Sequence, residues 1–172
     1  MSETPVSNPD AFGADVVLAD VKAHTLSEAL EAVLQALYKE RSLRQEDVPV
    51  AREALLSREA AGATAVGNAV AIPHARLEIV RRMVLAVARI DSPGLPPGPD
   101  GQPVRLVFCF LSPKDGRWDA HLTLLQRISR SARDPGWVQA CLTAPGAVGF
   151  AHMLRTGAGR NRHEEDSAKP TP

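Results

Sequence analysis

Two of the five histidines stand where a protein can use an imidazole for chemistry. His74 follows the apolar residues 70–72 and Pro73, so we expect it at the end of a buried strand, a common place for active-site residues in α/β proteins. His121 comes two residues after Asp119, a suitable N-cap, and is therefore expected in the first turn of a helix. The other three histidines are expected to be surface or packing residues without a role in the site: His24, His152 and His163.

The chemistry that suits this pair is phosphoryl transfer. A neutral imidazole is a good nucleophile near pH 7, and the reaction otherwise needs positive groups around the three equatorial phosphoryl oxygens. His74 is the candidate nucleophile, while the helix start at His121 offers backbone N–H groups for the oxygens. Arg58 is the candidate cation, although a solvated helix arginine is the simpler interpretation of that residue.

Helices and strands of suitable length surround these residues. An amphipathic helix is predicted over 25–40, with Thr25 and Glu28 as a capping box, and a second helix over about 47–61. Residues 82–90 and 104–111 are predicted strands, and the segment between them, rich in proline and glycine, is expected to be only a loop. Three helices follow, over 119–132, 135–143 and 145–155; in the first, Leu122, Leu125 and Ile128 are expected to share a buried face. The pattern suits a mixed sheet covered by helices.

Composition excludes several classes of function. The 172 residues contain 20 basic and 20 acidic side chains and only 4% aromatics, which argues against nucleic-acid binding. No stretch is apolar enough to insert in a membrane, and no secretion signal is recognisable, so we expect a cytoplasmic protein. Cys109 and Cys141 lack metal-type spacing and are expected to be buried apolar residues. Residues 1–14 and 156–172 have the composition of disordered tails around one domain over 15–155.

Two segments also carry a resemblance. "SREAAGATAVGNAVAIPHARL" (57–77) resembles the active-site segment of the type 2 enzyme IIA domains of the bacterial phosphotransferase system, the fructose, mannitol and nitrogen-regulatory family. "DGQPVRLVFCFLSPKDGRWDAHLTLLQRISR" (100–130) is similar to the strand–loop–helix segment of that family, with His121 at the place of its second histidine. The family pattern is filled in order by Arg58, Thr64, Gly67, Val70, Ala71, Ile72, Pro73 and His74.

The resemblance implies an α/β fold, a three-layer α/β/α sandwich with a central mixed sheet flanked by helices. It implies a phosphotransferase in which His74 accepts a phosphoryl group from the phosphocarrier HPr or a nitrogen-branch relative. His121 would stabilise the phosphate and Arg58 would supply positive charge, with no cofactor or metal. Two positions depart from the family: Ala75 replaces a common glycine, where its methyl group would crowd a partner, and Trp118 is an unexpected aromatic that suits either docking or packing.

The sequence leaves the destination of the phosphate open. The chain contains no IIB or IIC segment, which leaves a free-standing nitrogen-type regulator or one part of a split fructose- or mannitol-type transporter that would pass phosphate to a IIB domain. The regulator is favoured, because a lone chain with tails of disordered composition shows no sign of detachment from a transporter polypeptide. Regulatory target proteins would then be partners. A non-catalytic interaction module is a further alternative. A hydrolase with His74, His121 and Asp119 as metal ligands is disfavoured, since these residues lack the usual ligand spacing.

Overall fold

The computed structural model describes residues 12–115 and 118–157. In chain order the elements are β1 (Val16–Val21), α1 (Leu26–Lys39), the 3₁₀ turn η1 (Gln45–Asp47), α2 (Val48–Ala60), β2 (Ala65–Gly67), β3 (Val70–Ala71), β4 (His74–Leu77), β5 (Val84–Ile90), β6 (Leu95–Pro97), β7 (Pro103–Val104), β8 (Leu106–Pro113), α3 (Trp118–Ala132), α4 (Pro135–Thr143) and α5 (Gly146–Gly157).

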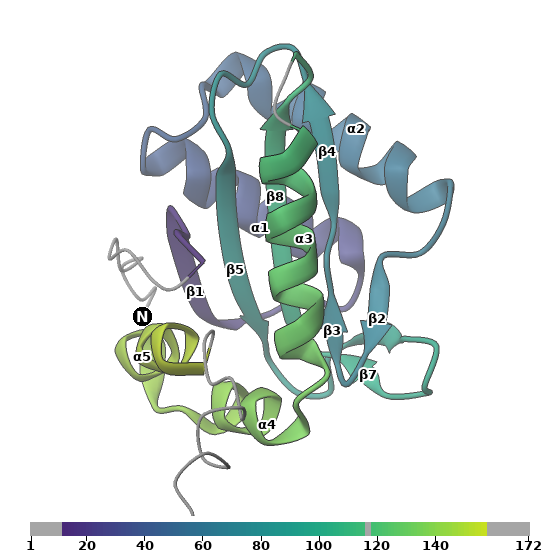
Figure 1. The fold of residues 1–172 in the computed structure, drawn as a ribbon, viewed down its shortest axis with the longest axis vertical. Coiled ribbons are helices and arrows are strands. Elements are labelled where there is room, and N and C mark those ends of the chain that lie inside the picture. Colours follow the sequence, from purple (N-terminus) through teal and green to yellow (C-terminus); the bar gives the residue numbers. More distant parts are fainter. Residues whose placement is uncertain (1–11, 116–117, 158–172) are drawn as a thin grey trace, which may run out of the picture.

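A mixed sheet forms the centre of the molecule (Figure 1). In the described residues it has six strands, in the order β1-β5-β8-β3-β2, with β4 continuing beside β8 after β3. The two central strands, β5 and β8, are antiparallel to each other. β1 is parallel to β5, β3 and β4 are parallel to β8, and β2 is antiparallel to β3. Every residue of β5 is buried, as expected of a strand covered on both faces.

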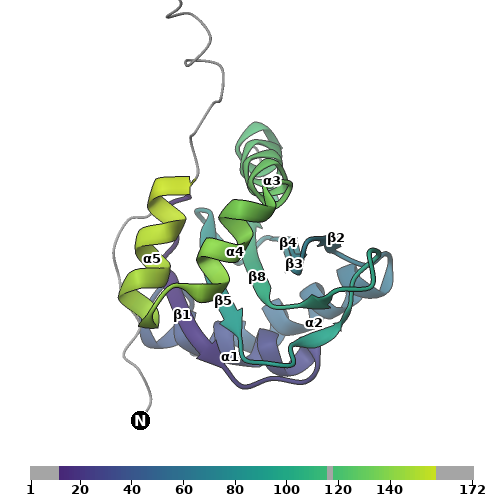
Figure 2. The same cartoon turned by 90° about the horizontal axis from the view of Figure 1, so that it is seen from below.

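Helices cover both faces of this sheet. Figure 2 shows α3, α4 and α5 on one side and α1 and α2 on the other. Each face has its own apolar core, because successive residues of a strand point to opposite sides. In β8, Cys109 and Leu111 belong to the core under α1 and α2, whereas Phe108 and Phe110 belong to the core under α3–α5. The α/β/α sandwich predicted from the sequence is confirmed.

Local sequence signals explain where the helices start. Thr25 and Glu28 form the predicted capping box of α1: the Thr25 hydroxyl accepts from the Glu28 N–H, and the Glu28 carboxylate accepts from the Thr25 N–H. Asp134 caps α4 by accepting from the N–H groups of Gly136 and Trp137. None of the helices in the described part of the chain has both the length and the apolar content that a bilayer-spanning helix needs.

Four local predictions were wrong. Asp119 is not an N-cap, because α3 begins at Trp118 and Asp119 lies within its first turn. The proline-rich segment expected to be only a loop contains the short antiparallel pair β6–β7, in which the backbone groups of residues flanking a tight turn satisfy one another. His74 does not end a strand but begins β4, because the chain resumes its pairing with β8 directly after Pro73. Leu122 is exposed, and the buried face of α3 consists of His121, Leu124, Ile128 and Ala132.

The packed part of the chain begins earlier than residue 15. Phe12 is only 6% exposed and Ala14 is also buried, in the core under α3–α5. The Phe12 ring lies edge-on to Phe108 at 5.6 Å between centroids and 6.0 Å from Trp137. Burial of the Phe12 ring in this core is favourable, because it removes a large apolar surface from water. Of the C-terminal segment expected to be disordered, Thr156 and Gly157 form the end of α5; residues 1–11 and 158–172 lie outside the described residues.

This packing makes Phe12 a stabilising residue. We expect Phe12→Ala to lower the free energy of unfolding by roughly 3 kcal/mol, the usual cost of removing a buried phenyl ring. Val148→Ala is the control, because Val148 is 71% exposed and its truncation should cost less than about 0.5 kcal/mol. Urea unfolding measures both, and equal midpoints would show that Phe12 adds nothing to the core.

Candidate functional site

His74 is held at the sheet surface by strand pairing and by a backbone acceptor. It is half-buried and lies opposite Phe110 in the β4–β8 register, and the two rings stack 5.3 Å apart with an angle of 14°. Its Nδ1 lies 2.7 Å from the carbonyl oxygen of Ile72. Since a carbonyl oxygen only accepts, Nδ1 must donate the proton. The neutral ring therefore keeps its free lone pair on Nε2.

The surroundings of His74 favour the neutral ring. Burial lowers the pKa of His74 below its usual value, and the positive charge of Arg58 lowers it further. The Ile72 carbonyl and the Glu59 carboxylate act in the opposite direction but do not cancel this shift in pKa. His74 is thus an uncharged imidazole near pH 7, the form that can act as a nucleophile.

His121 enters the same place from α3. Its ring is 4% exposed and stands edge-on to His74, with centroids 5.4 Å apart and an angle of 70°. Nδ1 of His121 lies 2.7 Å from the Ser112 hydroxyl. Burial lowers the pKa of His121 to about 4, with smaller contributions from His74 and the positive charge of Arg76. The structure therefore brings together the two histidines that the sequence singled out, both in neutral form.

Arg58 lies near this pair but does not hydrogen-bond to it in the described structure. It occupies the last turn of α2, and its Nη1 donates to the carbonyl of Gly62 at 2.9 Å. The next residue, Glu59, accepts from both the N–H and the hydroxyl of Thr64, and the Thr64 carbonyl accepts from the Ile72 N–H. This chain of hydrogen bonds ties the end of α2 to the backbone just before His74.

The structure places the side chains of Ala75 and Trp118 on opposite sides of the sheet, and only that of Trp118 lies at the outer edge of the site. The methyl group of Ala75 is buried in the core under α1 and α2, because Ala75 alternates with His74 along β4. It therefore does not crowd an approaching partner. Trp118 is 57% exposed, stands edge-on to His121 at 5.7 Å, and carries the guanidinium of Arg76 over its ring at 3.9 Å.

No pattern considered in the sequence pointed to supporting roles for Phe110, Ser112 and Arg76. A strand alternates its faces every residue, so Phe110 and Ser112 must share a face of β8, and Arg76 must share one with His74. That alternation was visible in the sequence. The pairing of β4 with β8, which places these four residues side by side, was not.

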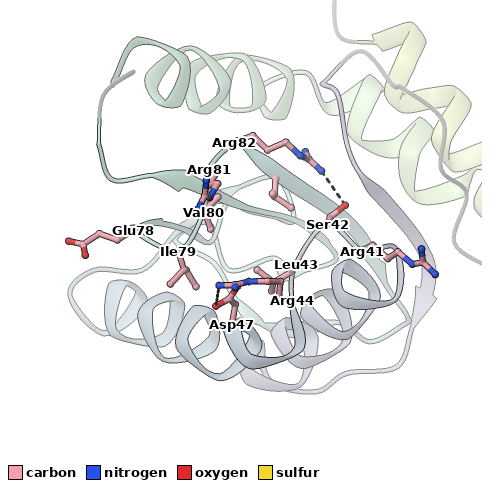
Figure 3. A pocket seen from close by; sticks show the side chains of 11 residues that line it. Arg41, Ser42, Leu43, Arg44, Asp47, Glu78, Ile79, Val80, Arg81 and Arg82 are labelled. Carbon is pink, nitrogen blue, oxygen red and sulfur yellow. Dashed lines mark hydrogen bonds and ion pairs between the residues drawn. The ribbon is translucent and has the colours of Figure 1, made fainter.

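An arginine-lined pocket lies apart from the two histidines. It has a volume of about 550 Å³ and opens between the α1–α2 connection and the β4–β5 connection (Figure 3). Arg44 pairs there with Asp47 at 2.7 Å, and Arg82 pairs with Asp15 at 2.6 Å. Neither His74 nor His121 lines this pocket. Within the described ranges, no three His, Cys, Asp or Glu side chains are grouped as a metal site would require.

Comparison with known proteins identifies the family. Residues 11–154 match the model of the family described as "Phosphoenolpyruvate-dependent sugar phosphotransferase system, EIIA 2". The nitrogen regulatory protein of Bradyrhizobium diazoefficiens is 37% identical over 125 residues, which cover 73% of this chain and 79% of that protein. The nitrogen regulatory protein of Escherichia coli K12 is 30% identical over 134 residues, covering 77% and 80%.

Solved structures agree in fold. The nitrogen regulatory protein IIA-Ntr of Neisseria meningitidis has a TM-score of 0.70 and 28% identity, covering 80% of this chain and 92% of that one. The mannitol IIA of Escherichia coli, at 21% identity and a TM-score of 0.61, shares the fold over 80% of this chain and 94% of its own. The chain therefore belongs to the type 2 enzyme IIA family of the phosphoenolpyruvate-dependent sugar phosphotransferase system.

Proposed function

We propose that this protein is a phosphohistidine carrier that accepts a phosphoryl group on Nε2 of His74 from the phosphohistidine of HPr or a nitrogen-branch HPr-like protein. The observation that carries the proposal is the fixed, neutral His74 ring. Its Nδ1 donates to the Ile72 carbonyl, so the free lone pair is on Nε2, and burial keeps the ring uncharged near pH 7.

The transfer needs no proton shuttle at the attacking atom. The Nε2 lone pair of His74 forms the new N–P bond while the N–P bond of the donor phosphohistidine breaks. The electron pair of the broken bond remains on the donor imidazole nitrogen. The phosphorylated ring keeps its Nδ1 proton and gains positive charge. The Ile72 carbonyl, already 2.7 Å from Nδ1, stabilises that charge.

His121 and Arg58 have separate roles in this proposal. If the Ser112 hydroxyl donates to Nδ1 of His121, the ring proton of His121 is on Nε2 and can donate to a phosphoryl oxygen. Arg58 adds positive charge from the end of α2; the same charge contributes to the lowered pKa of His74, which supports its assignment to the site. Preorganised donors of this kind act most strongly where charge is concentrated in the transition state.

The relatives favour a regulatory protein, and we propose that it acts in the cytoplasm. Nitrogen regulatory proteins from five bacteria match 65–77% of this chain at 30–37% identity. The alternative is the IIA component of a sugar transporter, because a fructose-specific EIIA component of Haloferax volcanii is 38% identical over 51% of the chain. A solved complex joins a mannitol IIA to a phosphorylated IIB. Mixing the phosphorylated protein with a fructose-type IIB distinguishes the regulatory role from the transporter role. Rapid transfer of the phosphoryl group to IIB supports the transporter role.

The two histidines should fail differently when replaced. His74→Ala removes the accepting atom, so incubation with phosphoenolpyruvate, enzyme I and HPr should leave it unlabelled. His121→Ala should still be phosphorylated, but with a transfer rate lower by about 100-fold, since it loses one hydrogen-bond donor to the phosphoryl oxygens. The wild-type adduct should be lost in acid and survive alkali, as a phosphorus–nitrogen bond does. Normal labelling of His74→Ala would refute the assignment of the nucleophile.

Arg58 should act through its planar fork as well as its charge. We expect Arg58→Lys to fold normally and to transfer about tenfold more slowly, since a lysine cannot reproduce bidentate contact with a phosphoryl group. Arg52→Lys is the matched control, because Arg52 is also on α2 and pairs with Glu31 instead. Single-turnover transfer from phospho-HPr measures both variants. Equal rates for the two would make Arg58 an ordinary surface residue.

The low pKa of His121 also predicts how stability depends on pH. Between pH 6.5 and about 4 the unfolded chain protonates this histidine while the folded protein keeps it neutral. Stability from this residue is therefore complete above pH 6.5 and falls as the pH drops through that window, by roughly 2 kcal/mol at pH 5.

Urea unfolding at pH 7, 6 and 5 measures this loss. The His121→Gln variant has no imidazole at this position and should lose less stability over the same range. The same slope in both proteins would show that His121 titrates normally in the folded state, and the neutral donor role proposed for it would then be wrong.

A further inference from the structure

We propose that Arg76 and Trp118 are positioning residues for His121: Arg76 holds the Trp118 indole in place as the outer wall against the His121 ring. The inference rests on the proposed phosphoryl transfer and adds two residues to it. Neither is assigned to contact the phosphoryl group.

Within the described part of the chain, the ring contacts and the hydrogen bond of His121 involve four side chains, and three of them belong to the sheet. Phe110 lies 5.0 Å from it between centroids and His74 lies 5.4 Å from it, while the Ser112 hydroxyl lies 2.7 Å from Nδ1. Phe110 and Ser112 are buried, and their strand pairs with β5 over Leu106–Leu111 and with β4 over Phe110–Pro113. These three sides of the ring are therefore fixed by the packed sheet.

The fourth side is different because Trp118 lies in the first turn of α3 and is 57% exposed. It stands edge-on to His121 at 5.7 Å, with an angle of 75°. An exposed indole at a helix start can ordinarily change its rotamer within nanoseconds. A wall for His121 on this side requires something that restrains the indole.

Arg76 provides that restraint. Its guanidinium carbon lies 3.9 Å from the centre of the Trp118 ring, well within cation–π distance. The same guanidinium donates from Nε and Nη2 to the carbonyl of Pro113, and from Nη2 to the carbonyl of Lys114 at 2.9 Å. Those carbonyls lie at the end of β8, so the indole rests on a cation that is anchored to the sheet.

The anchoring depends on the type and place of the residue. Arg76 follows His74 by two residues in β4 and therefore points to the same face of the sheet. A guanidinium can bind two carbonyls in its plane while its flat face stacks on an aromatic ring, which an ammonium group cannot do. Arginine is thus suited to hold both the strand end and the indole.

The function of such a wall is to keep His121 dry and in one orientation. Burial is the largest cause of the low pKa of His121; the positive charge of Arg76, and that of His74 when it is protonated, lower this pKa further. Removing the indole would admit water to the ring and weaken the preference for the neutral form. A wet, mobile His121 would present its proton to a phosphoryl oxygen less effectively, because preorganisation would be lost.

The test uses four variants of the full chain with two controls. Trp118→Ala removes the wall and Trp118→Phe keeps an aromatic ring; Arg76→Gln removes the charge and stacking, and Arg76→Lys keeps the charge alone. Leu122→Ala is the control for losing an exposed apolar side chain from the same helix, and Arg130→Gln is the control for losing an exposed arginine from it. Thermal unfolding first establishes that each variant is folded.

The first measurement is nitrogen-15 and proton NMR of the His121 ring in the unphosphorylated protein, which does not depend on phosphoryl transfer. We expect Trp118→Ala and Arg76→Gln to raise the pKa of His121 from about 4 by at least about one unit and to mix its tautomers. Trp118→Phe and Arg76→Lys should restore part of the wild-type behaviour. Both controls should match the wild type. An unchanged His121 ring in Trp118→Ala would overturn the proposal.

The second measurement is the steady-state rate of transfer from phospho-HPr. Loss of positioning should lower kcat about tenfold in Trp118→Ala while KM changes by less than about twofold. A rise in KM at constant kcat would instead make Trp118 a contact for the partner and would also overturn the proposal. If the His121 ring responds as expected but the wild type accepts no phosphate, then the proposed function fails while the positioning by Arg76 and Trp118 stands.

Discussion

The parallel pairing of β4 with β8 is the interaction on which the site depends. The Phe110 N–H donates to the Pro73 carbonyl at 3.0 Å, and this bond places His74 opposite Phe110. Because strand residues alternate between faces, the same register puts Arg76 on the face of His74 and turns Ala75 into the opposite core. A shift of one residue would bury the His74 side chain under α1 and α2.

Burial at this site favours neutral imidazoles, and the fold provides partners for the polar atoms that remain. Nδ1 of His74 and Nδ1 of His121 each have an oxygen at 2.7 Å, one from a backbone carbonyl and one from Ser112. An uncharged ring with one satisfied nitrogen can be buried at modest cost, whereas a charged one cannot. Structural stability and nucleophilic character therefore require the same protonation state here.

The edge of the site is built differently from its centre. The centre is held by packed strands, but the outer side consists of a stack in which Arg76 lies on Trp118 at 3.9 Å. Such a stack leaves the indole 57% exposed, whereas His121 behind it is buried. The arginine-lined pocket of Figure 3 is formed by other elements, so its charges serve a separate part of the surface.

The sequence by itself determined the order of the helices α1–α5 and of the strands β3, β5 and β8, the capping of α1 by Thr25 and Glu28, and the choice of His74, His121 and Arg58 as candidates. These features are local: they depend on hydrophobic period, on caps and on a motif whose residues are neighbours in the chain. Only the tertiary structure decided that Phe12 joins the core and that His74 begins a strand instead of ending one. It also decided that Ser112 and Trp118 contact His121. Those outcomes depend on which strands pair and in which register, and that choice is made by long-range packing that no short stretch of sequence contains.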